Sequence, residues 1–124
     1  MPKQKEIKVL MVKPGEQPYI TVIRNDLHAM QAAVGGLIEA SKLRGNAVLI
    51  SNEEGKINDL PGNRRMDNGD IIAGNFFIAG DNGRGGYTDL TDKQAAEYQS
   101  RFEKPEQFTP EQVQDALRME FTAW

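Results

Sequence analysis

Cysteine is absent from the 124-residue sequence, and histidine occurs once, at position 28. Without cysteine the chain has no disulfide, no thiolate metal ligand and no cysteine nucleophile. The single His28 leaves almost no material for a zinc site built on a histidine pair or for a Ser-His-Asp triad. We therefore expect neither a metal centre nor a cofactor.

Long apolar runs and a strong charge of one sign are also missing. No segment has the length of a membrane span or of a signal-peptide core, so the cytoplasm is the expected compartment. The 15 Lys and Arg against 18 Asp and Glu give a net charge of −3, too weak to gather nucleic acid or an acidic membrane. With 39% hydrophobic residues, the chain is expected to form one domain over residues 1–124.

The first half of the chain predicts a hairpin followed by a helix. Residues 7–12 and 19–24 are rich in aliphatic residues and are joined by a short Pro/Gly segment, which favours two antiparallel strands. Apolar residues then recur at helical spacing and predict a helix over residues 26–43 that buries Leu27, Met30, Val34, Leu37 and Ile38. Gly35 and Gly36 would lie inside this helix, explained either by close packing on the sheet or by a ligand or partner against the bare patch.

The second half predicts further strands and then two helices. Residues 47–51 are continuously apolar and indicate a strand buried on both faces, and residues 71–79 form another strong strand signal. Residues 57–60 are expected to return as a short strand, whereas residues 61–65 break regular structure. Thr91 with Gln94, and Thr109 with Gln112, are the start signals of two helices. We predict an α+β fold, a mainly antiparallel sheet with helices packed on one face, in the order ββ-α-βββ-αα.

Several segments invite a chemical interpretation. The glycine-rich residues 80–86 lack the Lys and Ser/Thr of a phosphate-binding loop, and a mobile hairpin loop is the simpler account. Glu53 and Glu54 suit general acid/base chemistry or a solvated turn. Arg64 and Arg65 suit recognition of a carboxylate or phosphate, or a plain salt bridge.

Aromatic residues close the sequence. Phe121 and Trp124 continue the apolar stripe of the last expected helix. They suit either a partner-binding anchor or the closure of the domain's own core.

Four motifs occur in order along the chain: VGGLIE at 34–39, NEEG at 52–55, LPGNR at 60–64 and IAGNFFIAG at 72–80. With them, residues 7–102 resemble an uncharacterised family of small domains, catalogued as a domain of unknown function and carried largely by phages, plasmids and integrative elements of bacteria. The resemblance implies a genetic setting and no reaction. Residues 103–124 form a C-terminal helical extension outside it. The polar motif residues of that family fall on Glu39, Asn52, Glu53, Glu54, Asn63 and Arg64.

We expect these six residues to converge as one ligand- or partner-binding site, or as an internal ion-pair network that fixes two loops. The resemblance favours a non-enzymatic binding protein of a mobile element, such as a counter-defence factor that occupies a host protein or captures a small, nucleotide-like anionic signal. A small hydrolase using Glu53 or Glu54 with Arg64 is one alternative. An accessory module for replication or transfer of the element is another.

Overall fold

A computed structural model describes residues 4–122, with side chains described up to residue 117. Among the described residues, no helix is long and apolar enough to cross a membrane. The elements along the chain are β1 (Glu6–Val12), β2 (Tyr19–Arg24), α1 (Leu27–Val34), β3 (Ile38–Leu43), β4 (Ala47–Asn52), β5 (Gly62–Arg65), β6 (Ile71–Ala73), β7 (Phe76–Asp81), β8 (Tyr87–Thr88), α2 (Asp92–Arg101) and α3 (Pro110–Thr122).

The main sheet has the strand order β2-β1-β7-β4-β3, and β8 pairs with the end of β7. Every pairing is antiparallel, with Leu10 of β1 and Leu49 of β4 both opposite Ile78 of β7. The α+β class and the mainly antiparallel sheet are therefore confirmed. Strand β4 is buried at every residue, as its continuous apolar run predicts.

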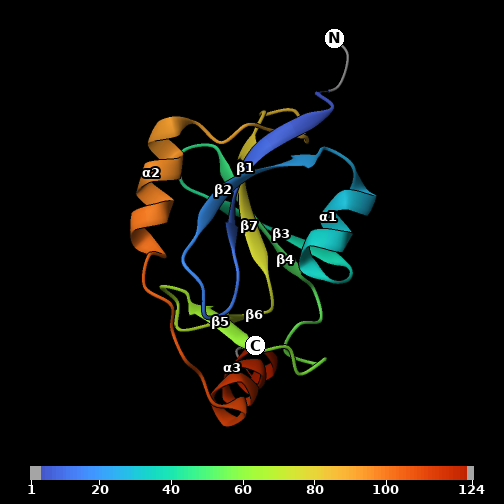
Figure 1. Cartoon of the computed structure of the whole chain (residues 1–124). Coiled ribbons are helices and arrows are strands. Elements are labelled where there is room, and N and C mark those ends of the chain that lie inside the picture. Colours follow the sequence, from blue (N-terminus) through green and yellow to red (C-terminus); the bar gives the residue numbers. More distant parts are fainter. Residues whose placement is uncertain (1–3, 123–124) are drawn as a thin grey trace.

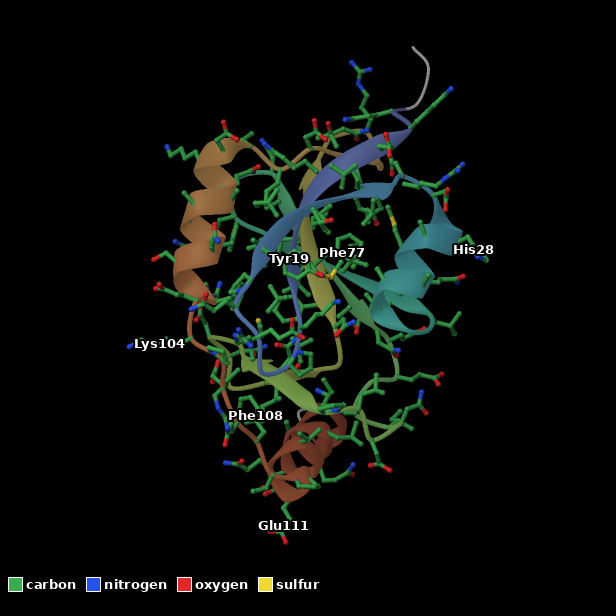
Figure 2. The ribbon with its side chains drawn as sticks, in the orientation of Figure 1. Tyr19, His28, Phe77, Lys104, Phe108 and Glu111 are labelled. Carbon is green, nitrogen blue, oxygen red and sulfur yellow. The ribbon has the colours of Figure 1, made fainter. Side chains whose placement is uncertain are left out.

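Helices cover both faces of this sheet, so the expectation that they pack on one face is wrong. Alternate residues of the central strands contribute to two separate cores. Phe76 and Ile78 face α2 together with Tyr98, whereas Phe77 faces α1 together with Met30. Figure 1 shows α1 and α2 on opposite sides of the sheet, and Figure 2 places Phe77 between the strands and α1.

Helix α1 ends at Val34, nine residues before the predicted end, because Gly35 adopts a left-handed conformation with φ of 80°. Its N–H donates to Gln31 O at 2.8 Å, which caps the helix. Residues 38–43, predicted as helix, form strand β3 instead. Leu27 and Leu37 are 58% and 54% exposed, so these two side chains do not belong to the core. The two glycines terminate the helix and do not lie inside it.

The region between β4 and β7 also departs from prediction. Residues 57–59 belong to a turn, residue 60 has no regular structure, and residues 62–65 form β5, which pairs with β6 in a separate two-stranded sheet. The expected strand 71–79 is two strands, interrupted at Gly74, whose φ of 81° breaks the extended conformation. The β5–β6 hairpin lies at the end of the main sheet next to α3 (Figure 1).

Both helix-start signals in the C-terminal part are confirmed. Thr91 and Gln94 form a capping box at α2, and Thr109 and Gln112 exchange the same two bonds at α3. Helix α3 packs on β6 in a small third core of Ile71, Ala73, Val113 and Ala116. The expectations for the Phe121 and Trp124 side chains lie outside the described residues.

The N-cap of α1 gives a pH-dependent prediction. The Asp26 carboxylate accepts from the Ala29 N–H at 2.7 Å, and this bond, with help from Arg24, holds the pKa of Asp26 below its ordinary value. A depressed pKa adds stability above about pH 4 that is lost as the pH falls. Urea unfolding at pH 7 and pH 3 should therefore show the wild type losing more stability on acidification than Asp26→Asn. An equal loss in both proteins would contradict this assignment.

Candidate functional site

An open cleft of about 350 Å³ lies where β3 and β4 meet the turn after β4, strand β6 and helix α3. We call it the acidic cleft. It is lined by Glu39, Ser51, Asn52, Glu53, Glu54, Gly55, Lys56, Ile57, Asp70, Ile71, Ile72, Ala73 and Leu117. Four of the six predicted site residues are among these lining residues.

Asn52 positions the two neighbouring carboxylates. Its side chain is buried, and its Nδ2 donates to Val34 O at 3.2 Å, which satisfies a carbonyl at the end of α1. Its Oδ1 accepts from the Glu54 N–H at 2.8 Å, forming an Asx turn. A Cβ at Gly36 would lie 2.8 Å from the Asn52 amide nitrogen, so the second glycine makes room for this contact. Asn52 therefore has a structural role at the edge of the cleft.

The turn that carries Glu53 and Glu54 packs tightly on β6. A Cβ at Gly55 would lie 2.5 Å from Ala73 O, a distance at which no side chain fits. Lys56 then donates to the Asp70 carboxylate at 2.5 Å, and this ion pair joins the turn to the start of β6. Because the turn is held at both points, Glu53 and Glu54 stay at the mouth of the cleft, where both are exposed.

Negative charge dominates the acidic cleft. Glu39, Glu53, Glu54 and Asp70 line it, and among the residues whose side chains the structure describes Lys56 is the one amine in the lining. Lys56 forms an ion pair with Asp70, and Glu39, Glu53 and Glu54 are exposed at the rim. Such a cleft attracts cations and hydrogen-bond donors and repels phosphates and carboxylates.

Asn63 is buried elsewhere, within strand β5. Its Nδ2 donates to Val12 O at 2.9 Å and to Gly74 O at 2.8 Å, and so ties β5 to the end of β1 and to the break between β6 and β7. Neither Asn63 nor Arg64 lines the acidic cleft. The expected convergence of all six residues is therefore incomplete.

Arg64 is fully buried, and among the described residues its guanidinium binds only neutral oxygens. Nε and Nη2 donate to Phe102 O at 3.1 and 2.9 Å, and Nη2 also donates to Glu16 O at 2.7 Å. Nη1 donates to Asn63 O and Asn63 Oδ1 at 3.2 and 2.8 Å. All five N–H donors are thus engaged.

The surroundings of Arg64 explain how a cation is held inside the protein. Burial lowers the pKa of Arg64, and the Glu106 carboxylate opposes that shift. Phe102 lies at the C-terminal end of α2, where unpaired carbonyls and the helix dipole favour a positive charge. Arg64 therefore fastens α2 to β5 and has no donor left for an external anion.

Sequence reasoning missed the two other charged residues that line the acidic cleft, Lys56 and Asp70. They lie 14 residues apart, in a turn and at a strand end, and no spacing rule joins such positions. Within residues 4–117, no group of three or more His, Asp or Glu side chains is arranged to hold a metal ion.

The comparison with protein families agrees with the resemblance to a domain of unknown function. The model of DUF3846, a domain of unknown function, matches residues 7–103. The chain belongs to the DUF3846 family. No curated protein and no solved structure matches it.

The DUF3846 match includes every lining residue of the acidic cleft except Leu117, which comes from α3. Arg64 and its partners Glu16, Asn63 and Phe102 also lie inside the match. The cleft and the buried arginine therefore both belong to the DUF3846 part of this chain.

Proposed function

We propose that this DUF3846 protein is a non-enzymatic binding protein that occupies a host protein through the acidic cleft. The observation that carries the proposal is the lining of the cleft, where, among side chains up to residue 117, carboxylates outnumber amines four to one. The partner surface that fits is basic, with Lys or Arg side chains reaching Glu53 and Glu54. Following the resemblance to a family carried largely by phages, plasmids and integrative elements, we propose a counter-defence role in a mobile element.

The positions of Arg64 and Lys56 make hydrolysis and the capture of a small anionic signal less favourable. A hydrolase using Glu53 or Glu54 with Arg64 needs the guanidinium beside those carboxylates, and its five donors are engaged by Phe102, Glu16 and Asn63. Capture of a nucleotide-like anion needs an available cation in the site, and Lys56, the one amine among the described lining residues, is paired with Asp70. The engaged guanidinium of Arg64 and the paired amine of Lys56 therefore both favour a basic protein partner.

Charge neutralisation tests this proposal. Tagged wild type and the double variant Glu53→Gln/Glu54→Gln are used to capture partners from a bacterial host lysate, with proteins and small molecules identified by mass spectrometry. Removing two rim charges should weaken retention of the basic partner about tenfold, equivalent to about 1.4 kcal/mol. The wild-type interaction should also weaken as salt is raised, because exposed charges are screened.

The matched control is Glu103→Gln/Glu111→Gln, which removes two exposed carboxylates that do not line the acidic cleft. It should retain the partner like the wild type. Equal retention by all three proteins, or recovery of a bound nucleotide in place of a protein, would contradict the proposal.

A further inference from the structure

Strand β3 is one edge of the main sheet, and the register shows which of its backbone groups point outward. The Glu53 N–H donates to Leu37 O at 2.8 Å, so residues 37 and 53 form a hydrogen-bonded pair next to the β3–β4 ladder. Because such pairs alternate in antiparallel sheets, residues 39, 41 and 43 bond to β4. The N–H and C=O groups of Ile38, Ala40 and Lys42 therefore point away from the sheet.

A second cleft, of about 750 Å³, adjoins the acidic cleft along the same strand. We call it the α2 cleft, because Tyr98 of that helix lines it together with Leu43 and Leu49. Asp70 and Ile72 line both clefts, so the two meet at the β6 end of the hairpin. They form one groove beside the edge of β3.

The side chains that β3 presents to this groove change in character along the strand. Glu39, Ser41 and Leu43 share one face of the strand, since they lie opposite Ser51, Leu49 and Ala47 of β4. Glu39 lines the acidic cleft, and Ser41 and Leu43 line the α2 cleft. Lys42 pairs with Val48 on the other face of the strand and also lines the rim of the α2 cleft. The strand thus offers an anionic, a small polar and an apolar position in series.

We propose that β3 accepts an extended segment of the partner protein as an added antiparallel strand. This rests on the proposed function and specifies how the partner is held. The outward groups of Ala40 and Lys42 supply the backbone bonds, and the two clefts supply side-chain selectivity. From its N-terminus the segment has an apolar residue opposite Leu43, an acidic one opposite Lys42, a small one opposite Ser41, any residue opposite Ala40 and a basic one opposite Glu39. The charged positions are chosen because opposite charges favour pairing across strands.

The other edge strand, β2, provides a control within the same molecule. The Asn25 N–H donates to Lys5 O at 2.8 Å, so the alternation leaves the N–H of Val22 pointing outward. Val22 is 56% exposed. Proline fits an edge strand where the missing N–H faces solvent. Ala40→Pro and Val22→Pro therefore remove one outward donor each, on opposite edges.

The probe is a fluorescein-labelled peptide, GVESTKG, whose central five residues follow the proposed pattern. Binding is measured by fluorescence polarisation, and folding of each variant by thermal melting. The wild type and Val22→Pro should bind it alike, and Ala40→Pro should bind at least about tenfold more weakly. The charge-swapped peptide GVKSTEG should bind the wild type at least about tenfold more weakly.

Peptide methylation tests the backbone bonds without altering the protein. In the proposed register the peptide threonine lies opposite Ala40 and directs its N–H at β3, whereas the serine directs its N–H away. N-methylation at threonine should abolish binding, and N-methylation at serine should leave it unchanged. This comparison decides the question even where Ala40→Pro does not fold.

Three results would overturn the proposal. One is equal binding of both methylated peptides, and another is undiminished binding by folded Ala40→Pro. The third is a dimer, seen by sedimentation without peptide, that Ala40→Pro dissolves, since a second copy would then occupy β3. Partner capture lost in Glu53→Gln/Glu54→Gln but kept in Ala40→Pro would leave the acidic cleft as the site and reject only strand addition.

Discussion

Replacing Arg64 by alanine is expected to lower the free energy of unfolding by about 3–5 kcal/mol. The change removes five hydrogen bonds and leaves the carbonyls of Phe102, Glu16 and Asn63 without these donors in a buried region. It also leaves a cavity where a large, fully buried side chain lay. Urea unfolding followed by circular dichroism measures the loss.

The neighbouring residue gives the matched control for this experiment. Arg65 is exposed, stacks over Phe108 at 5.6 Å and donates to Gly69 O, so Arg65→Ala should cost less than about 1 kcal/mol. Arg64→Lys keeps the charge but has three donors for five acceptor contacts and should fall between the two. An Arg64→Ala protein as stable as the wild type but unable to capture its partner would instead make Arg64 a recognition residue.

Local signals in the sequence predicted much of this fold correctly. The two capping boxes, at Thr91 and Thr109, need only residues three apart, and both form as expected. The first hairpin and β4 also lie where their aliphatic runs indicate. These features depend on short-range patterns, which a sequence displays directly.

The wrong predictions concern segments where tertiary packing overrides the local sequence pattern. Leu37 and Ile38 continue the helical spacing of α1, yet Gly35 turns the chain and the following residues pair with β4. The prediction that all helices pack on one face of the sheet conflicts with another prediction from the same sequence. A strand predicted as buried on both faces, residues 47–51, requires cover on both sides of the sheet.

Only part of the candidate site could be predicted from the sequence, because some of its contacts join distant segments. Glu39, Asn52, Glu53 and Glu54 meet because β3 and β4 are consecutive strands, and a hairpin brings its two ends together. For Arg64 the sequence predicted anion recognition or a salt bridge, because a guanidinium suits carboxylates and phosphates. Its partners, the carbonyls of Glu16 and Phe102, lie 48 and 38 residues away, and backbone acceptors leave no trace in a sequence.

The two phenylalanines at the start of β7 test whether the sheet has a core on each face. Phe76 packs edge-on against Phe102 at 5.4 Å on the α2 side, whereas Phe77 lies with Met30 on the α1 side, and both are fully buried. Phe76→Ala and Phe77→Ala should therefore each cost about 3–5 kcal/mol. In a sheet covered on one face only, one of these variants would be close to neutral.

Leu37→Ala completes this comparison, because the sequence alone predicted a buried side chain there. With 54% of Leu37 exposed, the substitution should change the free energy of unfolding by less than about 0.5 kcal/mol. Urea unfolding of the three variants under one condition separates the possibilities. If Leu37→Ala lowered the free energy of unfolding strongly and Phe77→Ala hardly at all, the structure would be contradicted. That result would favour the long helix over residues 26–43 and a sheet covered on one face, since only that arrangement buries Leu37 and exposes one face of β7.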